Sequence, residues 1–381
     1  MGLDQMLKIT LLLGLATAAQ SAVFTLDSQT HHLGVKGQPE WDIFEGNVPE
    51  SDSLKLTFTS HPNEREFTLF IRQEDVKQEW PVTLNGHKLG QLFLMEADLI
   101  HTLAVPAGTL REGENELVIT TKTKEDILIR SIALGDDAKE RLLTSTLTVN
   151  VLEKATGEPV PSRITIVDSN RSLIPIFDDG DTNLATRPGV VYTATGRARF
   201  RTIAGRPALY ATRGPEYTMA VARDVDLESD KTVDLTIERV ADTHGWVSSD
   251  THIHTFSFSK HGDALLRERI ITLAGEGIEL PISTEHNLHA DYQPAIEELG
   301  LGKYFTLVRG NEVLFAGFLR ANTQDANLLG LAPLLRQNRN PSFGQLPLQS
   351  PANPRASRAD RCVPSQSPPD RNVSMTLRHL A

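Results

Sequence analysis

Six of the twelve histidines lie between residues 244 and 289, and their spacing is suited to metal binding. In the segment Asp250-Thr251-His252-Ile253-His254, an extended strand would place Asp250, His252 and His254 on one face, because side chains alternate in direction along a strand. Two imidazoles at positions i and i+2 can share one metal ion. Such a pair alone is also compatible with ordinary surface histidines, so a metal site requires further ligands.

Further ligands follow two later apolar segments. His286 comes directly after one of them, in Thr284-Glu285-His286, and Glu312 follows the next, in Gly310-Asn311-Glu312. If these segments are parallel strands joined by right-handed crossovers, their carboxyl ends lie at one edge of the sheet. Imidazole and carboxylate ligands suit Zn²⁺, Mn²⁺ or Fe²⁺. The single cysteine, Cys362, excludes a four-cysteine zinc site, a CxxC pair and an intramolecular disulfide.

The elements that must position these residues alternate between strand and helix over residues 241–315. Apolar residues recur at helical spacing in one segment and form short β-type runs in the others. The predicted order is therefore β-α-β-α-β, which is typical of a parallel sheet in an α/β domain. The predicted strands are Val247–Asp250, Leu280–Thr284 and Phe305–Arg309, and the predicted helices are Asp263–Ala274 and Pro294–Leu299.

Two β-rich modules precede this segment. Residues 23–140 alternate short apolar strands with turns, and Asn85-Gly86 is typical of a tight hairpin. The sequences VTLNGHKLGQL and VPAGTLREGENELVI resemble a galactose-binding-like jelly roll. Because that fold also serves as a spacer, carbohydrate binding at this β-sandwich stays open. The predicted strands are Leu54–Phe58, Phe67–Ile71, Pro81–Leu84, Gly113–Thr120 and Ile127–Leu134.

Residues 145–240 are predicted to form a second, smaller β-sandwich. The segment LTVNVLEKATGEPVPSRITIVD is similar to the immunoglobulin-like regulatory sandwich attached to carboxypeptidases and to many secreted enzymes. Asp178, Asp179 and Asp181 form an acidic loop whose spacing is not that of an EF-hand, and we expect it to be solvated rather than a calcium site.

The first 22 residues are predicted to be a signal peptide. Lys8 precedes an apolar run from Ile9 to Ala19, and small residues follow up to Ala22. The run is too short to span a bilayer, and no later segment approaches the length of a membrane span. A buried N-terminal helix is the alternative. We therefore expect a secreted or periplasmic protein, and the net charge of −11 argues against a nucleic-acid partner.

Residues 316–381 differ in composition from the rest of the chain. They contain eight arginines and eight prolines but only three acidic residues, with no lysine and no glutamate. One interpretation is a disordered basic tail. The other, which we favour, is that the chain leaves its natural reading frame near Val313.

Residues 245–313 resemble the polymerase and histidinol phosphatase (PHP) superfamily of metal-dependent hydrolases. The similarity is carried by DTHIHT, HGDALLRERIITLAGEGIELPISTEHN and GNEV, and it is greatest to the secreted branch related to carbaryl hydrolase. The resemblance implies a β/α barrel with up to three divalent ions. It implies that His252, His254, His261 and His286 are metal ligands and that Glu312 bridges two ions. Asp250 and Glu285 are assigned to the catalytic site as residues that support these ligands.

The implied reaction is hydrolysis of a phosphoester, carbamate or other ester by metal-activated water, with a small molecule or phosphoester as substrate. The family has further ligands after the bridging glutamate, namely another histidine and a late Asp-x-His pair. After Glu312 this chain has only His379. The catalytic domain is therefore predicted to be truncated. The alternative is an inactive chain that acts at most as a β-sandwich binding module.

Overall fold

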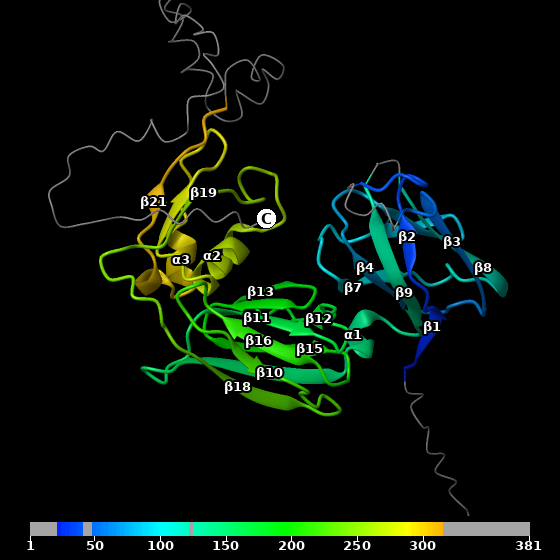
Figure 1. Ribbon diagram of the computed structural model, residues 1–381, viewed down its shortest axis with the longest axis horizontal. Helices are drawn as coiled ribbons and strands as arrows, with labels where there is room; N and C mark the ends of the chain where they lie inside the picture. Colours follow the sequence, from blue (N-terminus) through cyan, green and yellow to red (C-terminus); the bar gives the residue numbers. More distant parts are fainter. Residues whose placement is uncertain (1–20, 41–47, 122–124, 315–381) are drawn as a thin grey trace, which may run out of the picture. The chain divides into compact units, whose positions relative to one another are not determined.

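The computed structural model describes residues 21–40, 48–121 and 125–314 (Figure 1). The chain divides into two compact units, with the boundary between Thr144 and Ser145. The predicted signal peptide up to residue 20 and the predicted tail at 316–381 lie outside the described residues. Within these three ranges, no helix has the length and apolar character needed to cross a membrane.

Unit 1 is a β-sandwich of two antiparallel sheets, as predicted for a β-rich module. The core between the sheets is built around Trp80, which is fully buried among leucine, isoleucine and valine side chains. The short helix α1 (Lys139–Leu142) follows the last strand. One sheet has the order β1-β9-β4-β7 with β2 also paired to β9, and the other has the order β3-β8-β5-β6. The strands are β1 (Val23–Asp27), β2 (His31–Leu33), β3 (Ser53–Ser60), β4 (Phe67–Glu74), β5 (Pro81–Leu84), β6 (His87–Gln91), β7 (Leu99–Val105), β8 (Gly113–Thr120) and β9 (Ile127–Gly135).

The hairpin between β5 and β6 confirms the turn prediction. Asn85 and Gly86 have φ values of 53° and 80°, which is the left-handed conformation that a two-residue hairpin turn requires. The Asn85 side chain donates to the Thr109 carbonyl oxygen at 2.9 Å and to the Asn115 side chain at 2.7 Å. Asn85 therefore makes the turn and also ties it to a neighbouring loop.

His101 gives unit 1 an expected dependence on pH. Burial lowers the pKa of His101 from 6.5 to about 4, although a 3.2 Å contact between its Nε2 and the Gln91 carbonyl oxygen opposes the shift. In the unfolded chain His101 binds a proton as the pH falls below about 6.5, whereas in the folded chain it does so only near pH 4. The stabilising contribution is therefore complete above pH 6.5 and is lost as the pH falls toward 4.

We expect the free energy of unfolding of unit 1 to be about 2 kcal/mol lower at pH 5 than at pH 7 because of this group. The measurement is the guanidinium concentration at the midpoint of unfolding of unit 1, at both pH values. Pulsed hydrogen exchange of the β9 amides reports the folded fraction at each guanidinium concentration. His101→Gln keeps a donor for the Gln91 carbonyl and should remove most of the difference. An equal pH dependence in the variant would contradict the assignment to His101.

Unit 2 begins with a second two-sheet sandwich. Its sheets have the orders β12-β15-β10-β18 and β13-β14-β11-β16-β17. In the acidic loop after β12, Asp179 pairs with Arg201 at 2.5 Å. The strands are β10 (Ser145–Glu153), β11 (Ser162–Val167), β12 (Ile176–Phe177), β13 (Leu184–Arg187), β14 (Val190–Thr193), β15 (Arg197–Thr202), β16 (Ala208–Thr212), β17 (Ala220–Ala222) and β18 (Lys231–Ile237).

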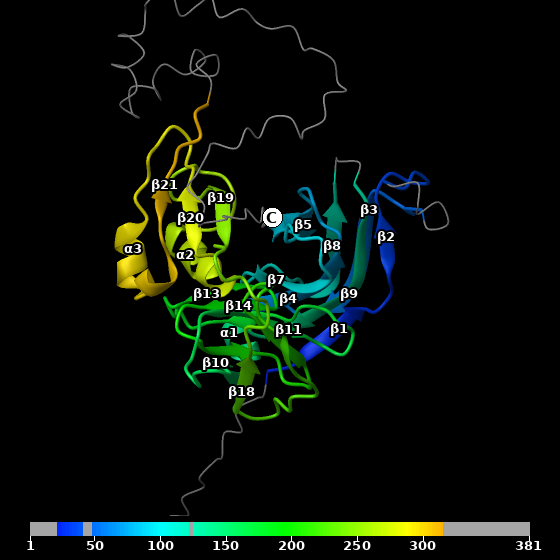
Figure 2. The same cartoon turned by 60° about the vertical axis from the view of Figure 1, so that its left-hand side comes forward.

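The α/β segment of unit 2 has the predicted β-α-β-α-β order (Figure 2). Its three strands form a parallel sheet in chain order. The first helix starts at Leu266 rather than at Asp263, because Asp263 and Ala264 are held in other hydrogen bonds. The elements are β19 (Ser249–Ile253), α2 (Leu266–Gly275), β20 (Leu280–Ser283), α3 (Gln293–Glu298), the 3₁₀ turn η2 (Gly302–Tyr304) and β21 (Val308–Arg309).

The α/β segment and the second sandwich share one hydrophobic core. Ala185 of β13 and the neighbouring Ala194 are buried in the same cluster as Ile270 and Ile271 of α2. Gly275 permits a close approach, because a Cβ atom there would lie 2.7 Å from the Tyr192 ring. Residues 145–314 therefore form one packed unit, in which the sandwich supports α2.

Candidate metal centre

The predicted ligands come together at the carboxyl edge of the three-stranded parallel sheet. His252 lies at the end of β19, and His254 follows that strand directly. His286 and Glu312 follow β20 and β21, and the two residues form an isolated parallel bridge. In Figure 2 the three strands lie next to one another in one sheet. The parallel topology therefore brings together residues that are far apart in the sequence.

Three imidazoles surround one carboxylate oxygen. Glu312 Oε2 lies 3.0 Å from His254 Nε2, 3.1 Å from His252 Nε2 and 3.5 Å from His286 Nε2. His254 is the most buried of these side chains at 15 % exposure, whereas His252 is 61 % exposed. One face of the centre is therefore open to solvent, and its inner face is formed by His254.

His261 joins the centre from the loop before α2. Its Nε2 lies 3.1 Å from His286 Nε2, and its ring centre lies 4.8 Å from that of His254. The five side chains form two overlapping ligand groups, His252–His254–Glu312 and His254–His261–His286, and the donor atoms of each group lie within 4.8 Å of one another. His289, in the same histidine-rich stretch, is exposed and belongs to neither group.

The donor set fits a divalent transition metal. With metal–ligand bonds of about 2.1 Å, two ligands of one tetrahedral ion lie about 3.4 Å apart. The contacts of 3.0, 3.1 and 3.5 Å around Glu312 are close to that separation. Four imidazole nitrogens and one carboxylate suit Zn²⁺, Mn²⁺ or Fe²⁺, and they do not suit Ca²⁺, which prefers oxygen ligands.

The electrostatics of the centre favour a neutral His254 imidazole beside an ionised Glu312 carboxylate. Burial lowers the pKa of His254, and the neighbouring imidazoles lower it further against the opposing effect of Glu312. The hydrogen bond from His252 is the main cause that lowers the pKa of Glu312. Metal ligands must be deprotonated, so both shifts prepare the centre for a cation.

Asp250 lies beside the backbone of a predicted ligand. Its Oδ1 accepts a hydrogen bond of 3.1 Å from the His252 backbone N–H. This contact fixes the strand end from which His252 projects. The predicted role of Asp250 in orienting an imidazole stays a prediction.

Glu285 is fully buried next to His286, and its carboxylate organises the loop after β19. It accepts hydrogen bonds from Thr255 Oγ1 at 2.7 Å, from Tyr292 OH at 2.5 Å and from the hydroxyl of Ser259. The backbone N–H groups of Thr255 and Ser259 donate to it at 3.2 and 3.1 Å. Burial alone would raise the pKa of Glu285, but the hydrogen bonds from these hydroxyls lower it below its usual value.

Ser259 links Glu285 to the ligands, and it was not singled out from the sequence. Its hydroxyl oxygen accepts the His286 backbone N–H at 3.0 Å and lies 3.4 Å from His254 Nδ1. Because His254 turns Nε2 toward Glu312, its Nδ1 is the nitrogen that would carry the proton when Nε2 binds a metal. Ser259 is placed to accept that N–H. The sequence shows only that Ser259 lies five residues after His254. Serine is too common for that spacing to identify a partner of a metal ligand from one sequence.

Removing this hydroxyl should weaken metal binding. We expect Ser259→Ala to raise the dissociation constant for Zn²⁺ about 10-fold to 100-fold, which is the usual effect of losing a partner of a metal-bound histidine. Competition with a chromophoric chelator measures the constant. Ser257→Ala is the matched control, because Ser257 Oγ accepts the Leu266 N–H in the same loop. Equal dissociation constants for Ser259→Ala and the wild type would show that Ser259 does not support metal binding.

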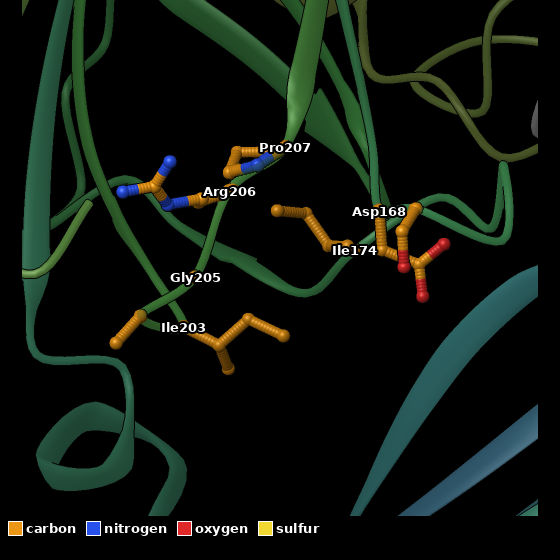
Figure 3. Close-up of a pocket in the computed structure, with 8 residues that line it drawn as sticks. Asp168, Ile174, Ile203, Gly205, Arg206 and Pro207 are labelled. Carbon is orange, nitrogen blue, oxygen red and sulfur yellow. The ribbon is translucent and has the colours of Figure 1, made fainter. Parts of the chain in front are cut away.

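A cavity of about 220 Å³ lies in the second sandwich, outside the metal centre (Figure 3). Asp168 and Arg206 are among its lining residues, and Figure 3 shows their side chains pointing in opposite directions. Asp168 Oδ1 accepts the backbone N–H groups of Asn170 and Ser172 at 2.8 and 2.9 Å. The carboxylate therefore serves its own loop, and the cavity adds nothing to the metal centre.

Comparison with known proteins does not assign a family. No protein-family profile matches the chain, and no curated protein matches it. Solved structures with local similarity include a GH26-CBM35 β-(1,4)-mannanase from Podospora anserina, with 18 % identity, a TM-score of 0.21, and coverage of 30 % of this chain and 27 % of the mannanase. The chain thus spans about a quarter of the mannanase's length.

Two further matches are single carbohydrate-binding modules. The CBM36-1 domain of a multidomain xylanase from the hindgut metagenome of Trinervitermes trinervoides has 11 % identity and a TM-score of 0.21, with coverage of 31 % of this chain and 98 % of the module. A CBM36 in complex with calcium and xylotriose has 6 % identity and a TM-score of 0.19, with coverage of 29 % and 97 %. These low scores describe a partial likeness and do not assign a function.

Proposed function

We propose that this chain carries a divalent-metal centre of the PHP hydrolase type, in a secreted or periplasmic protein. The observation that supports it is the convergence of three imidazoles on the Glu312 carboxylate, with their Nε2 atoms 3.0 to 3.5 Å from one oxygen. A fourth imidazole, His261, lies against His286 at 3.1 Å. His252 and His254 would hold one ion, and His261 and His286 would hold another. Glu312 would serve as a ligand to both ions.

The proposed activity is hydrolysis of a phosphoester, carbamate or other ester. A bound divalent ion supplies a water of lowered pKa and a Lewis acid for the attacked oxygen. The protein's own part is to hold the ligands. Glu285 and Ser259 fix the loop after β19, which carries His254, and the exposed side of His252 leaves room for a small substrate.

The test is the metal content of the purified full chain after dialysis, measured by elemental analysis. We expect about one or more equivalents of Zn, Mn or Fe. His252→Ala/His254→Ala should lose the metal, and His289→Ala should keep it. The wild type should then hydrolyse p-nitrophenyl phosphate or p-nitrophenyl acetate faster than the double variant. Absence of metal from the wild-type chain would rule out the proposed metal centre. Bound metal without hydrolysis would rule out the proposed activity and leave a metal-binding site.

The second candidate is a chain without catalytic activity that acts as a β-sandwich binding module, with carbohydrate as the ligand class. One observation favours it. After Glu312 the sequence has one histidine, His379, and no Asp-x-His pair, whereas the family resemblance implies further ligands there. Retention of the full chain on insoluble xylan or mannan, together with absence of bound metal, would support this candidate over the hydrolase.

A further inference from the structure

The backbone around His261 has a conformation that must be held in place. Lys260 has a φ of 61° and Gly262 has a φ of 74°, so both neighbours of His261 are in the left-handed region. Glycine adopts this region freely, whereas for a lysine it costs about 1 kcal/mol. His261 itself is exposed. Its position toward His286 therefore depends on how the following residues are anchored.

The anchor is Arg187, at the end of β13 in the second sandwich. Its Nε donates to Asp263 Oδ2 at 2.8 Å, and its Nη2 donates to the Asp263 carbonyl oxygen at 2.7 Å. Its Nη1 donates to Glu268 Oε1 on α2 at 3.0 Å and to the Thr186 carbonyl oxygen at 2.7 Å. One planar guanidinium thus binds its own strand, the loop that follows His261, and the first turn of α2.

The geometry of these bonds restricts the loop strongly. Asp263 is held through its side chain and its backbone at the same time, two residues after His261. A guanidinium presents its donors in a rigid plane, so two bonds to one residue fix that residue's orientation as well as its distance. The Arg187 side chain is 25 % exposed and that of Asp263 is 73 % exposed, so the restraint comes from the two-bond geometry rather than from burial of the pair.

We propose that Arg187 is a positioning residue of the metal centre, through which the second β-sandwich sets the location of His261. This inference rests on the proposed function for the metal itself. It assigns the sandwich a part in metal binding that lies beyond the five ligands. The sandwich residue acts through Asp263 and does not touch the metal.

The same interface offers a matched control at the other end of α2. Arg163 of β11 pairs with Glu276 at 3.1 Å, and Tyr192 OH donates to the same carboxylate at 2.8 Å. Arg163 therefore also joins the sandwich to the α2 segment through an ion pair, but it lies at the end of the helix away from His261. Loss of Arg163 tests the general effect of weakening this interface.

The first experiment measures Zn²⁺ affinity of the full chain by chelator competition. We expect Arg187→Gln to raise the dissociation constant about 10-fold to 100-fold, as for other residues that orient a ligand. Arg187→Lys should recover only part, because an ammonium cannot reproduce the planar contacts. Arg163→Gln should change the constant less than about 3-fold. In a His261→Ala background, Arg187→Gln should have no further effect, because the two residues act on one ligand.

The second experiment does not depend on metal. Hydrogen exchange of the peptide 255–266 should be about 10-fold faster in Arg187→Gln than in the wild type, while exchange in β20 is unchanged. Additive effects of Arg187→Gln and His261→Ala on affinity, or an equal effect of Arg163→Gln, would overturn the inference. If the wild type binds no metal, the proposed function falls, and the exchange result decides alone: unchanged exchange in 255–266 overturns the role of Arg187.

Discussion

Glu312→Gln should lower the affinity for Zn²⁺ by at least about 100-fold. The substitution keeps the size of the side chain but removes the charge on the oxygen that three imidazoles approach within 3.5 Å. Loss of a residue that only supports a ligand already lowers metal affinity by up to about 100-fold. Loss of a central carboxylate ligand should therefore lower the affinity by at least that factor. Isothermal titration of the full chain with ZnCl₂ measures the change.

The control for this prediction is Glu297→Gln. Glu297 lies on α3, where its side chain accepts a hydrogen bond from Gln293 at 3.0 Å. It carries the same charge as Glu312 but belongs to neither ligand group. If both variants lose affinity equally, the effect of Glu312 is one of net charge, and the carboxylate is not a ligand.

Glu285→Ala should destabilise the α/β segment by at least about 4 kcal/mol. The buried carboxylate accepts hydrogen bonds from two backbone N–H groups and three hydroxyls. Each buried donor left without a partner costs about 1–3 kcal/mol, and water entering the space recovers part of the sum. Protection of the β20 amides from hydrogen exchange measures the loss.

Glu285→Gln separates charge from shape in the same experiment. The amide retains one acceptor oxygen, but its NH₂ group faces donors that then have no acceptor. We expect the β20 amides of Glu285→Gln to be less protected than in the wild type and more protected than in Glu285→Ala. Unchanged protection in Glu285→Ala would show that the loop holds its shape without this carboxylate, and the support of His254 through Ser259 would have to be abandoned.

The convergence of the main ligands could be predicted because it depends on simple periodicities. His252 and His254 are two residues apart at the end of one strand, and the parallel order of three strands brings His286 and Glu312 to the same edge. Neither step needs detailed packing. The position of His261, in contrast, came only from the family resemblance, because no periodicity fixes the end of a loop.

The support of the ligands could not be predicted, for a physical reason. Arg187 and Asp263 meet through the packing of α2 on the second sandwich, and the sequence shows no signal of that contact. The same contact explains why α2 begins at Leu266. The carbonyl groups of Asp263 and Ala264, just before the helix, accept hydrogen bonds from Arg187 and from the Phe256 backbone N–H.

The shared core of the second sandwich and the α/β segment limits how these two parts can be recombined with parts of other genes. A recombination event that joined a foreign sandwich to residues 241–314 would have to supply a small side chain at position 185, a ring that fits Gly275, and an arginine opposite Asp263. Residues 145–314 are therefore expected to pass between genes as one piece, separable from unit 1 at the boundary between Thr144 and Ser145.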